Sequence, residues 1–175
     1  KDVYNVVKYT DLWLSKFFNQ IKSEKWFRET IFIITADHTC GSRYNNLYKN
    51  KIGKYAIPLI VFSGDSTVTG NIKEISQQID IMPTCLELLG YNKPFFAFGK
   101  PISYNDSWSI SFLQNEYTFI TDNGIIINKE EVYNMYNDWA LSNEIQLNMN
   151  DVLKLKAIKQ HYNNRLIENR LIYEN

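Results

Sequence analysis

The chain has 175 residues, which is long enough for a domain with a hydrophobic core of its own. Its 19 basic residues are balanced by 19 acidic residues, and this balance argues against a protein that holds nucleic acid through phosphate contacts. No apolar run reaches the roughly 18 residues that a membrane-spanning helix needs, and no signal peptide is visible.

The first predicted element is an amphipathic helix over residues 2–22, whose apolar residues recur at helical spacing. Because the sequence begins inside this pattern, we expect the chain to be part of a longer protein. Residues 30–36 follow as a short, unbroken apolar run rich in β-branched side chains. Such a run predicts a strand that is buried on both faces. It ends abruptly at Asp37 and His38.

Residues 41–54 are polar and rich in Asn and Lys, which predicts a surface loop. A second apolar strand is predicted over 55–62, with Pro58 near its start or on a sheet edge because proline cannot donate a ladder hydrogen bond. Asp80 is a plausible N-cap for the next helix, and Gly90 is its expected C-terminal stop. Helices and strands therefore alternate, which predicts an α/β fold.

The pattern changes after about residue 104. Short stretches of alternating apolar and polar residues, separated by the turn signal at residues 122–124, predict a small antiparallel meander. A terminal helix is predicted over 151–170. Its inward face is expected to carry Leu153, Ala157, Ile158, Tyr162, Leu166 and Ile167. We therefore expect two domains, 1–104 and 105–175.

The most informative position is the pair Asp37 and His38 at the end of the first strand. In open α/β sheets, functional groups collect beyond the carboxyl ends of strands. A carboxylate and an imidazole can both reach one divalent cation, at about 2.0–2.2 Å, if the chain turns as it leaves the strand. Gly41 permits such a turn. On these two residues alone, an aspartate that caps a loop remains the simpler interpretation.

Weaker candidates have structural explanations. Cys40 and Cys85 lack the spacing of a metal site, so we interpret them as free or buried thiols, with a disulfide as the alternative. His161 is expected to lie at the surface or in packing contacts. Asp80 is expected to cap rather than to bind metal. The lysines of the 41–54 loop fit a solvated loop better than an anion site.

A series of short motifs occurs in a fixed order along the chain. They are Lys8–Asp11, Phe17–Phe18, Ile33–Thr39, Ile57–Ile60, Gln78–Thr84, Leu88–Tyr91 and Phe98–Lys100. This series resembles the C-terminal half of the sulfatase family within the alkaline phosphatase superfamily. It is most similar to lipoteichoic acid synthases and related phosphoglycerol transferases. The resemblance covers nearly the whole chain and implies the C-terminal portion of an α/β/α sandwich, followed by the meander and the terminal helix.

The resemblance also implies chemistry. Asp37 and His38 match positions that bind a divalent metal in this family, Mn²⁺ or Mg²⁺ foremost, with Zn²⁺ or Ca²⁺ as alternatives. The nucleophile and an acidic ligand are expected upstream, in an N-terminal half that would be this chain's partner, so no catalytic residue is expected here. The intact enzyme would act on an anionic lipid or glycan ester at the extracytoplasmic face of a bacterial membrane.

Three functions stay open. His38 directly after Asp37 favours a phosphoglycerol-type transferase, whereas many sulfatases carry another residue there. A sulfatase that hydrolyses sulfate esters is the alternative, although Cys40–Arg43 lacks the proline of the sulfatase nucleophile motif. A non-catalytic binding module with the same fold is the third. The isolated chain is expected to bind metal weakly, to be inactive, and to self-associate through an exposed apolar face.

Overall fold

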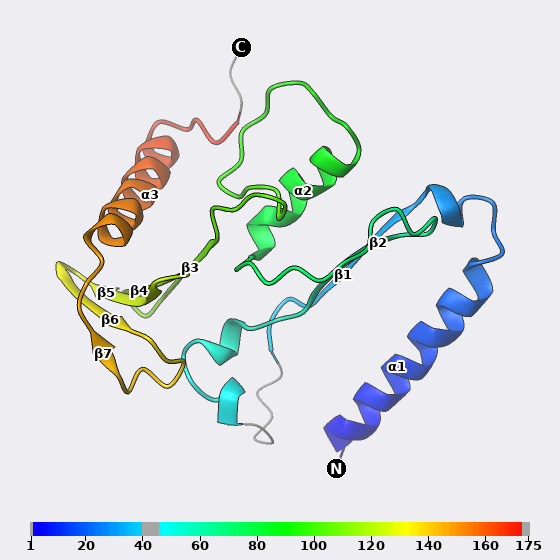
Figure 1. Ribbon diagram of the computed structural model, residues 1–175, viewed down its shortest axis with the longest axis horizontal. Coiled ribbons are helices and arrows are strands. Elements are labelled where there is room, and N and C mark those ends of the chain that lie inside the picture. Colours follow the sequence, from blue (N-terminus) through cyan, green and yellow to red (C-terminus); the bar gives the residue numbers. More distant parts are fainter. Residues whose placement is uncertain (1, 40–45, 173–175) are drawn as a thin grey trace. The chain divides into compact units, whose positions relative to one another are not determined.

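The structure is a computed structural model that describes residues 2–39 and 46–172 (Figure 1). The chain forms two compact units, Lys1–Asn71 and Ile72–Asn175. The expected mixed α/β fold with a meander and a terminal helix is confirmed. The domain boundary expected between residues 104 and 105 stays a prediction.

The first unit contains one long helix and a pair of strands. Its elements are α1 (Asp2–Ile21), a short 3₁₀ turn η1 (Phe27–Glu29), β1 (Ile31–Thr35), two further 3₁₀ turns, η2 (Asn46–Tyr48) and η3 (Gly53–Tyr55), and β2 (Leu59–Ser63). The two strands pair antiparallel, from Ile31 opposite Ser63 to Thr35 opposite Leu59. Pro58 stands directly before β2, as the sequence predicted. Residues 55–57, which we expected in the strand, precede it instead.

The prediction that β1 is buried on both faces is wrong. Its four apolar residues are only partly buried, and Thr35 is exposed. A strand is buried on both faces only where a layer covers each face, and in the part of the chain that the structure describes the residues of β1 are covered only in part. One face of this pair packs through a cluster of phenylalanine rings. They are Phe18 of α1, Phe27 of η1, Phe32 of β1 and Phe62 of β2.

The helix α1 forms where the sequence predicted it, but most of its apolar residues lie at the surface of this unit. Val3, Val6, Val7, Leu14 and Phe17 are all exposed. Phe18 and Ile21 are partly buried, and the Phe18 ring lies 5.4 Å from the Phe32 ring. The helical periodicity therefore predicted α1 correctly, although only the C-terminal end of the helix packs against the strands.

The second unit begins with a 3₁₀ turn η4 (Gln78–Asp80) that runs into α2 (Ile81–Leu88). Asp80 is the N-cap of α2, yet its side chain does not bond the helix. Instead Oδ2 accepts the Gln77 N–H at 2.9 Å, which closes a capping box around η4, and Oδ1 accepts the Lys100 N–H at 3.0 Å. The carboxylate is fully buried. These bonds satisfy the buried carboxylate, as burial of a polar group requires. They also tie the loop at Lys100 to the start of α2.

Two glycines complete this region for different reasons. Gly90 has φ +67° and ends α2, with its N–H bonded to Glu87 and the Tyr91 N–H bonded to Leu86. These two bonds form a Schellman motif, and Gly90 is the C-terminal stop that the sequence predicted. Gly99 lies so close to Ile79 that a Cβ atom there would stand 2.0 Å from the Ile79 carbonyl oxygen. Any side chain at Gly99 would therefore displace the loop that Asp80 holds.

The antiparallel meander is confirmed. Its strands are β3 (Trp108–Leu113), β4 (Glu116–Thr121), β5 (Gly124–Lys129), β6 (Val132–Tyr136) and β7 (Glu144–Ile145), in that spatial order. The helix α3 (Met149–Ile167) follows, and Asn148 caps it by accepting from the N–H groups of Asn150 and Asp151. The core of this unit lies between the sheet and α3. It consists of Trp108, Phe119, Ile126, Met135, Val152 and Leu155.

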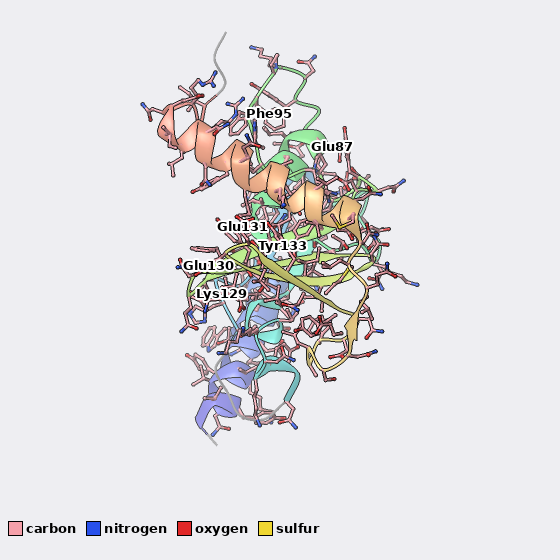
Figure 2. The ribbon with its side chains drawn as sticks, turned by 90° about the vertical axis from the view of Figure 1, so that its left-hand side faces the viewer. Glu87, Phe95, Lys129, Glu130, Glu131 and Tyr133 are labelled. Carbon is pink, nitrogen blue, oxygen red and sulfur yellow. The ribbon has the colours of Figure 1, made fainter. Side chains whose placement is uncertain are left out.

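The predicted inward face of α3 is largely wrong. Of that set only Ile158 packs against the core, whereas Leu153 is 60% exposed and Ile167 is 83% exposed. The buried residues of α3 are Asp151, Val152 and Leu155. Figure 2 shows α3 lying over the sheet beside Tyr133. Burial, together with the charge of Glu131, raises the pKa of the Tyr133 hydroxyl.

Candidate metal centre

The candidate site begins where β1 ends. The Thr35 hydroxyl donates a hydrogen bond to the Pro58 carbonyl at 2.9 Å, which joins the end of β1 to the residue before β2. After Thr35 the backbone leaves the strand, and Asp37 and His38 follow in a bend. The strand pair therefore holds the backbone just before Asp37 and His38 in place, while the two side chains project beyond the strands.

The structure brings the functional atoms of Asp37 and His38 together. The backbone N–H of His38 donates to Oδ1 of Asp37 at 2.8 Å. This bond occupies one carboxylate oxygen and leaves Oδ2 facing Nε2 of His38 at 3.5 Å. Consecutive residues in a strand point to opposite faces, so the bend after Thr35 is what places both side chains on one side.

The other ring nitrogen of His38 is also engaged. Nδ1 lies 3.0 Å from the Thr39 carbonyl oxygen. A carbonyl oxygen can only accept a hydrogen bond, so Nδ1 carries the proton and Nε2 keeps its lone pair in the neutral imidazole. A histidine that donates through one nitrogen to a backbone carbonyl is arranged to bind metal through the other.

These atoms fit two neighbouring ligands of one small divalent cation. Two ligands about 2.1 Å from a tetrahedral metal ion lie about 3.4 Å apart, and Nε2 of His38 is 3.5 Å from Oδ2 of Asp37. Both side chains are open to solvent, with 75% of His38 and 87% of Asp37 exposed. Within residues 2–39 and 46–172, no group of three or more His, Cys, Asp or Glu side chains gathers to hold a metal. The described residues therefore offer two donors, fewer than the four to six that divalent cations normally use.

The neighbouring hydroxyl of Thr39 was not predicted from the sequence. It donates to the Lys54 carbonyl at 2.8 Å and so ties the Asp37–His38 bend to η3. Nothing in the sequence pattern signals this bond, because it joins residues fifteen positions apart and depends on the path of the intervening loop.

The remaining candidates take structural positions. Asp80 is buried, and each of its carboxylate oxygens accepts one backbone N–H. His161 contacts the rings of Phe96 and Phe98, and its Nε2 accepts from Nε of Arg165 at 3.1 Å. His161 is exposed and also makes packing contacts, so both placements that the sequence left open are present. Cys85 is a free, partly buried thiol.

Two predictions concern the loop after the site. Cys40, Gly41 and the rest of residues 40–45 lie outside the described residues. Lys49 bonds Asn46, its neighbour in the same loop, at 2.7 Å, and is exposed. This placement agrees with a solvated loop.

None of the helices in the described part of the chain has the length and apolar character to cross a bilayer.

A family model described as Sulfatase matches residues 2–91, which is more than half of the 175 residues. The chain belongs to the sulfatase family. The matched residues include α1, both strands of the first unit, the Asp37–His38 pair and α2. The meander and α3 of this sulfatase-family chain lie beyond the match.

A solved structure extends the comparison to the second unit. The chain is similar to a protein in the alkaline phosphatase superfamily from Vibrio parahaemolyticus, with a TM-score of 0.79 at 20% sequence identity. The similarity covers 97% of this chain and 43% of the Vibrio chain. The sulfatase-family chain therefore has a fold found in the alkaline phosphatase superfamily, and it spans less than half the length of that relative.

Proposed function

We propose that Asp37 and His38 hold a divalent metal ion in a phosphoryl- or sulfuryl-ester enzyme. The observation that carries this proposal is the donor pair itself. Oδ2 of Asp37 and Nε2 of His38 are 3.5 Å apart, with each residue's other polar atom bonded to the backbone. Membership of the sulfatase family supports the reaction class.

The two residues would bind and orient rather than react. A bound divalent metal would stabilise charge on the ester oxygens and activate a nucleophile. Asp37 would contribute a carboxylate oxygen and His38 an imidazole nitrogen as metal ligands. Since two donors bind a hard cation weakly, the other ligands and the nucleophile would come from an N-terminal half that partners this chain. The 175 residues alone would then be inactive.

We infer further that the parent enzyme is a phosphoglycerol-type transferase of the extracytoplasmic bacterial envelope, with Mn²⁺ or Mg²⁺ as its metal and an anionic lipid or glycan ester as its substrate. The histidine directly after Asp37 and the ordered motifs favour transfer. A sulfatase is the second candidate, because the matching family model is described by that name.

The experiment compares metal binding and turnover in the full-length protein. Mn²⁺ binding is measured by electron paramagnetic resonance, and release of a phospholipid headgroup or of sulfate from an aryl ester is measured in parallel. We expect Asp37→Asn and His38→Ala each to weaken Mn²⁺ binding at least tenfold. Mutation of residues that only hydrogen-bond to a metal ligand already costs about 10- to 100-fold in affinity, so loss of a ligand should cost no less. Matched controls are Asp11→Asn, on α1, and His161→Ala, the other histidine.

The outcomes separate the candidates. Headgroup release with Mn²⁺ supports the transferase, whereas sulfate release alone supports the sulfatase. Unchanged Mn²⁺ binding in both site variants would overturn the metal proposal. A full-length protein that binds no divalent metal and turns over neither substrate would instead favour a non-catalytic module that keeps the fold.

A further inference from the structure

We propose that Thr39 is a positioning residue for His38. Its backbone carbonyl holds the proton on Nδ1 of the imidazole, and its side-chain hydroxyl fixes that carbonyl by bonding to Lys54 of η3. The inference rests on the proposed metal-binding role of His38. It adds a residue outside the donor pair, and it makes a claim about the imidazole that can be measured without any metal.

The need for such a device follows from exposure. The side chain of His38 is 75% exposed, so packing against neighbours cannot fix the direction of its ring. An imidazole in solvent samples several rotamers and both neutral tautomers. Directed hydrogen bonds are therefore what can hold its orientation, and the bond from Nδ1 to the Thr39 carbonyl, 3.0 Å long, is one of them.

The carbonyl of Thr39 must in turn be held in place. Thr39 follows the bend beyond β1, where no ladder bond restrains it in the described strand pair. Its hydroxyl donates to the Lys54 carbonyl at 2.8 Å. The position of Thr39 therefore depends on η3, fifteen residues further along the chain.

The segment that receives this bond is itself anchored. Ile52, directly before η3, is only 3% exposed, and the N–H of Gly53 donates to Oδ1 of Asn50 at 2.7 Å. A series of contacts thus leads from a buried isoleucine through η3 and Thr39 to an exposed histidine. The hydroxyl of Thr39 joins the His38 end of this series to η3.

The chain offers a close control in Thr35. Its hydroxyl also donates to a backbone carbonyl across the strand pair, that of Pro58, at 2.9 Å. Thr35→Val removes the same kind of bond four residues earlier without touching His38 or Thr39. Any general loosening of the unit would therefore affect both valine variants, whereas loss of the imidazole's orientation would affect only Thr39→Val.

The first test reads the tautomer in the metal-free, full-length protein labelled with ¹⁵N. Long-range ¹H–¹⁵N spectra are recorded near pH 8.5, about two units above the usual pKa of a free imidazole. A His38→Gln variant assigns the His38 signals in the full-length protein, because only those signals disappear. We expect Nδ1 of His38 to be protonated in the wild type, in Thr39→Ser and in Thr35→Val. In Thr39→Val we expect its shifts to move toward the Nε2-protonated form.

The second test measures Zn²⁺ binding by calorimetry in the same four proteins, because Zn²⁺ is diamagnetic and binds imidazole well. We expect Thr39→Val to weaken binding about tenfold, at the low end for a residue one contact behind a ligand. Thr39→Ser and Thr35→Val should bind Zn²⁺ as the wild type does. Circular dichroism checks that every variant is folded.

The results separate this proposal from the one on which it rests. A wild-type His38 protonated on Nε2, or a Thr39→Val protein with wild-type ring shifts, overturns the positioning role whatever the metal does. If no protein binds Zn²⁺ but Thr39→Val alone changes the tautomer, the proposed metal site fails and the positioning of His38 by Thr39 stands.

Discussion

The hydroxyl of Thr121 donates a hydrogen bond to Oδ2 of Asp151 across 2.9 Å. The side-chain amide of Asn123 donates to the same oxygen at 3.0 Å. Asp151 lies in the first turn of α3, whereas Thr121 is the last residue of β4 and Asn123 lies in the turn between β4 and β5. One nearly buried carboxylate therefore joins the meander to the terminal helix.

We expect Asp151→Ala to destabilise the protein by about 2–3 kcal/mol, because it leaves two donors without their charged acceptor and removes a carboxylate from a helix N-terminus. Asp151→Asn keeps one acceptor oxygen and should lose less. Urea denaturation followed by circular dichroism measures both. The control is Asn163→Ala, an exposed change on the same helix. A loss below about 0.5 kcal/mol in Asp151→Ala, typical of a surface position, would contradict this role.

A second prediction concerns the ring cluster of the first unit. Phe32 lies at its centre, with ring centroids of Phe18, Phe27 and Phe62 at 5.4, 5.2 and 5.0 Å. Phe32→Ala should cost about 2–3 kcal/mol, somewhat less than a fully buried phenylalanine because the site is only partly enclosed. Since Phe18 links α1 to the strands, the amides of α1 should exchange hydrogen faster.

Hydrogen exchange read by mass spectrometry tests this expectation. Phe112→Ala is the matched control, because Phe112 is an exposed ring on β3 in the second unit. It should leave exchange in α1 unchanged. If α1 exchanged equally fast in the wild type and in Phe32→Ala, the helix would not depend on this cluster for its order.

Local signals in the sequence predicted local structure well. Pro58 marks the start of β2, and Gly90 ends α2 through its positive φ. These residues act on the backbone around them, so neighbouring sequence is enough to interpret them. The closeness of Asp37 and His38 is a local feature of the same kind, because the two residues are consecutive in the chain.

Burial was harder to predict because it depends on what lies opposite. An apolar run such as β1 is buried on both faces only if layers cover both, and in the described part of this chain its residues are only partly covered. The residues of α3 contain two apolar stripes, one through Val152 and Leu155 and one through Leu153 and Ala157. Periodicity cannot tell which of them faces the sheet. The Thr39–Lys54 bond could not be predicted either, because it joins residues fifteen positions apart in the sequence.

The last prediction concerns Asp65, whose carboxylate accepts three hydrogen bonds. The Ser63 hydroxyl donates to Oδ1 at 2.6 Å, and Thr67 donates from its hydroxyl at 2.8 Å and from its N–H at 3.0 Å. These bonds favour the ionised form. They lower the pKa of Asp65 from 3.8 to about 2, with the Ser63 bond as the largest cause.

The sign of the effect on stability follows from this depression. The folded protein holds Asp65 ionised at a pH where the unfolded chain has bound a proton, so the hydrogen bonds contribute fully above pH 3.8 and are lost as the pH falls toward about 2. A ¹³C NMR titration of the side-chain carboxyl should give a pKa near 2 in the wild type and a higher value, toward 3.8, in Ser63→Ala. Ser15→Ala, at an exposed serine of α1, is the control and should leave the titration unchanged. A wild-type midpoint near 3.8 would mean that the Ser63 and Thr67 bonds do not hold the carboxylate in solution.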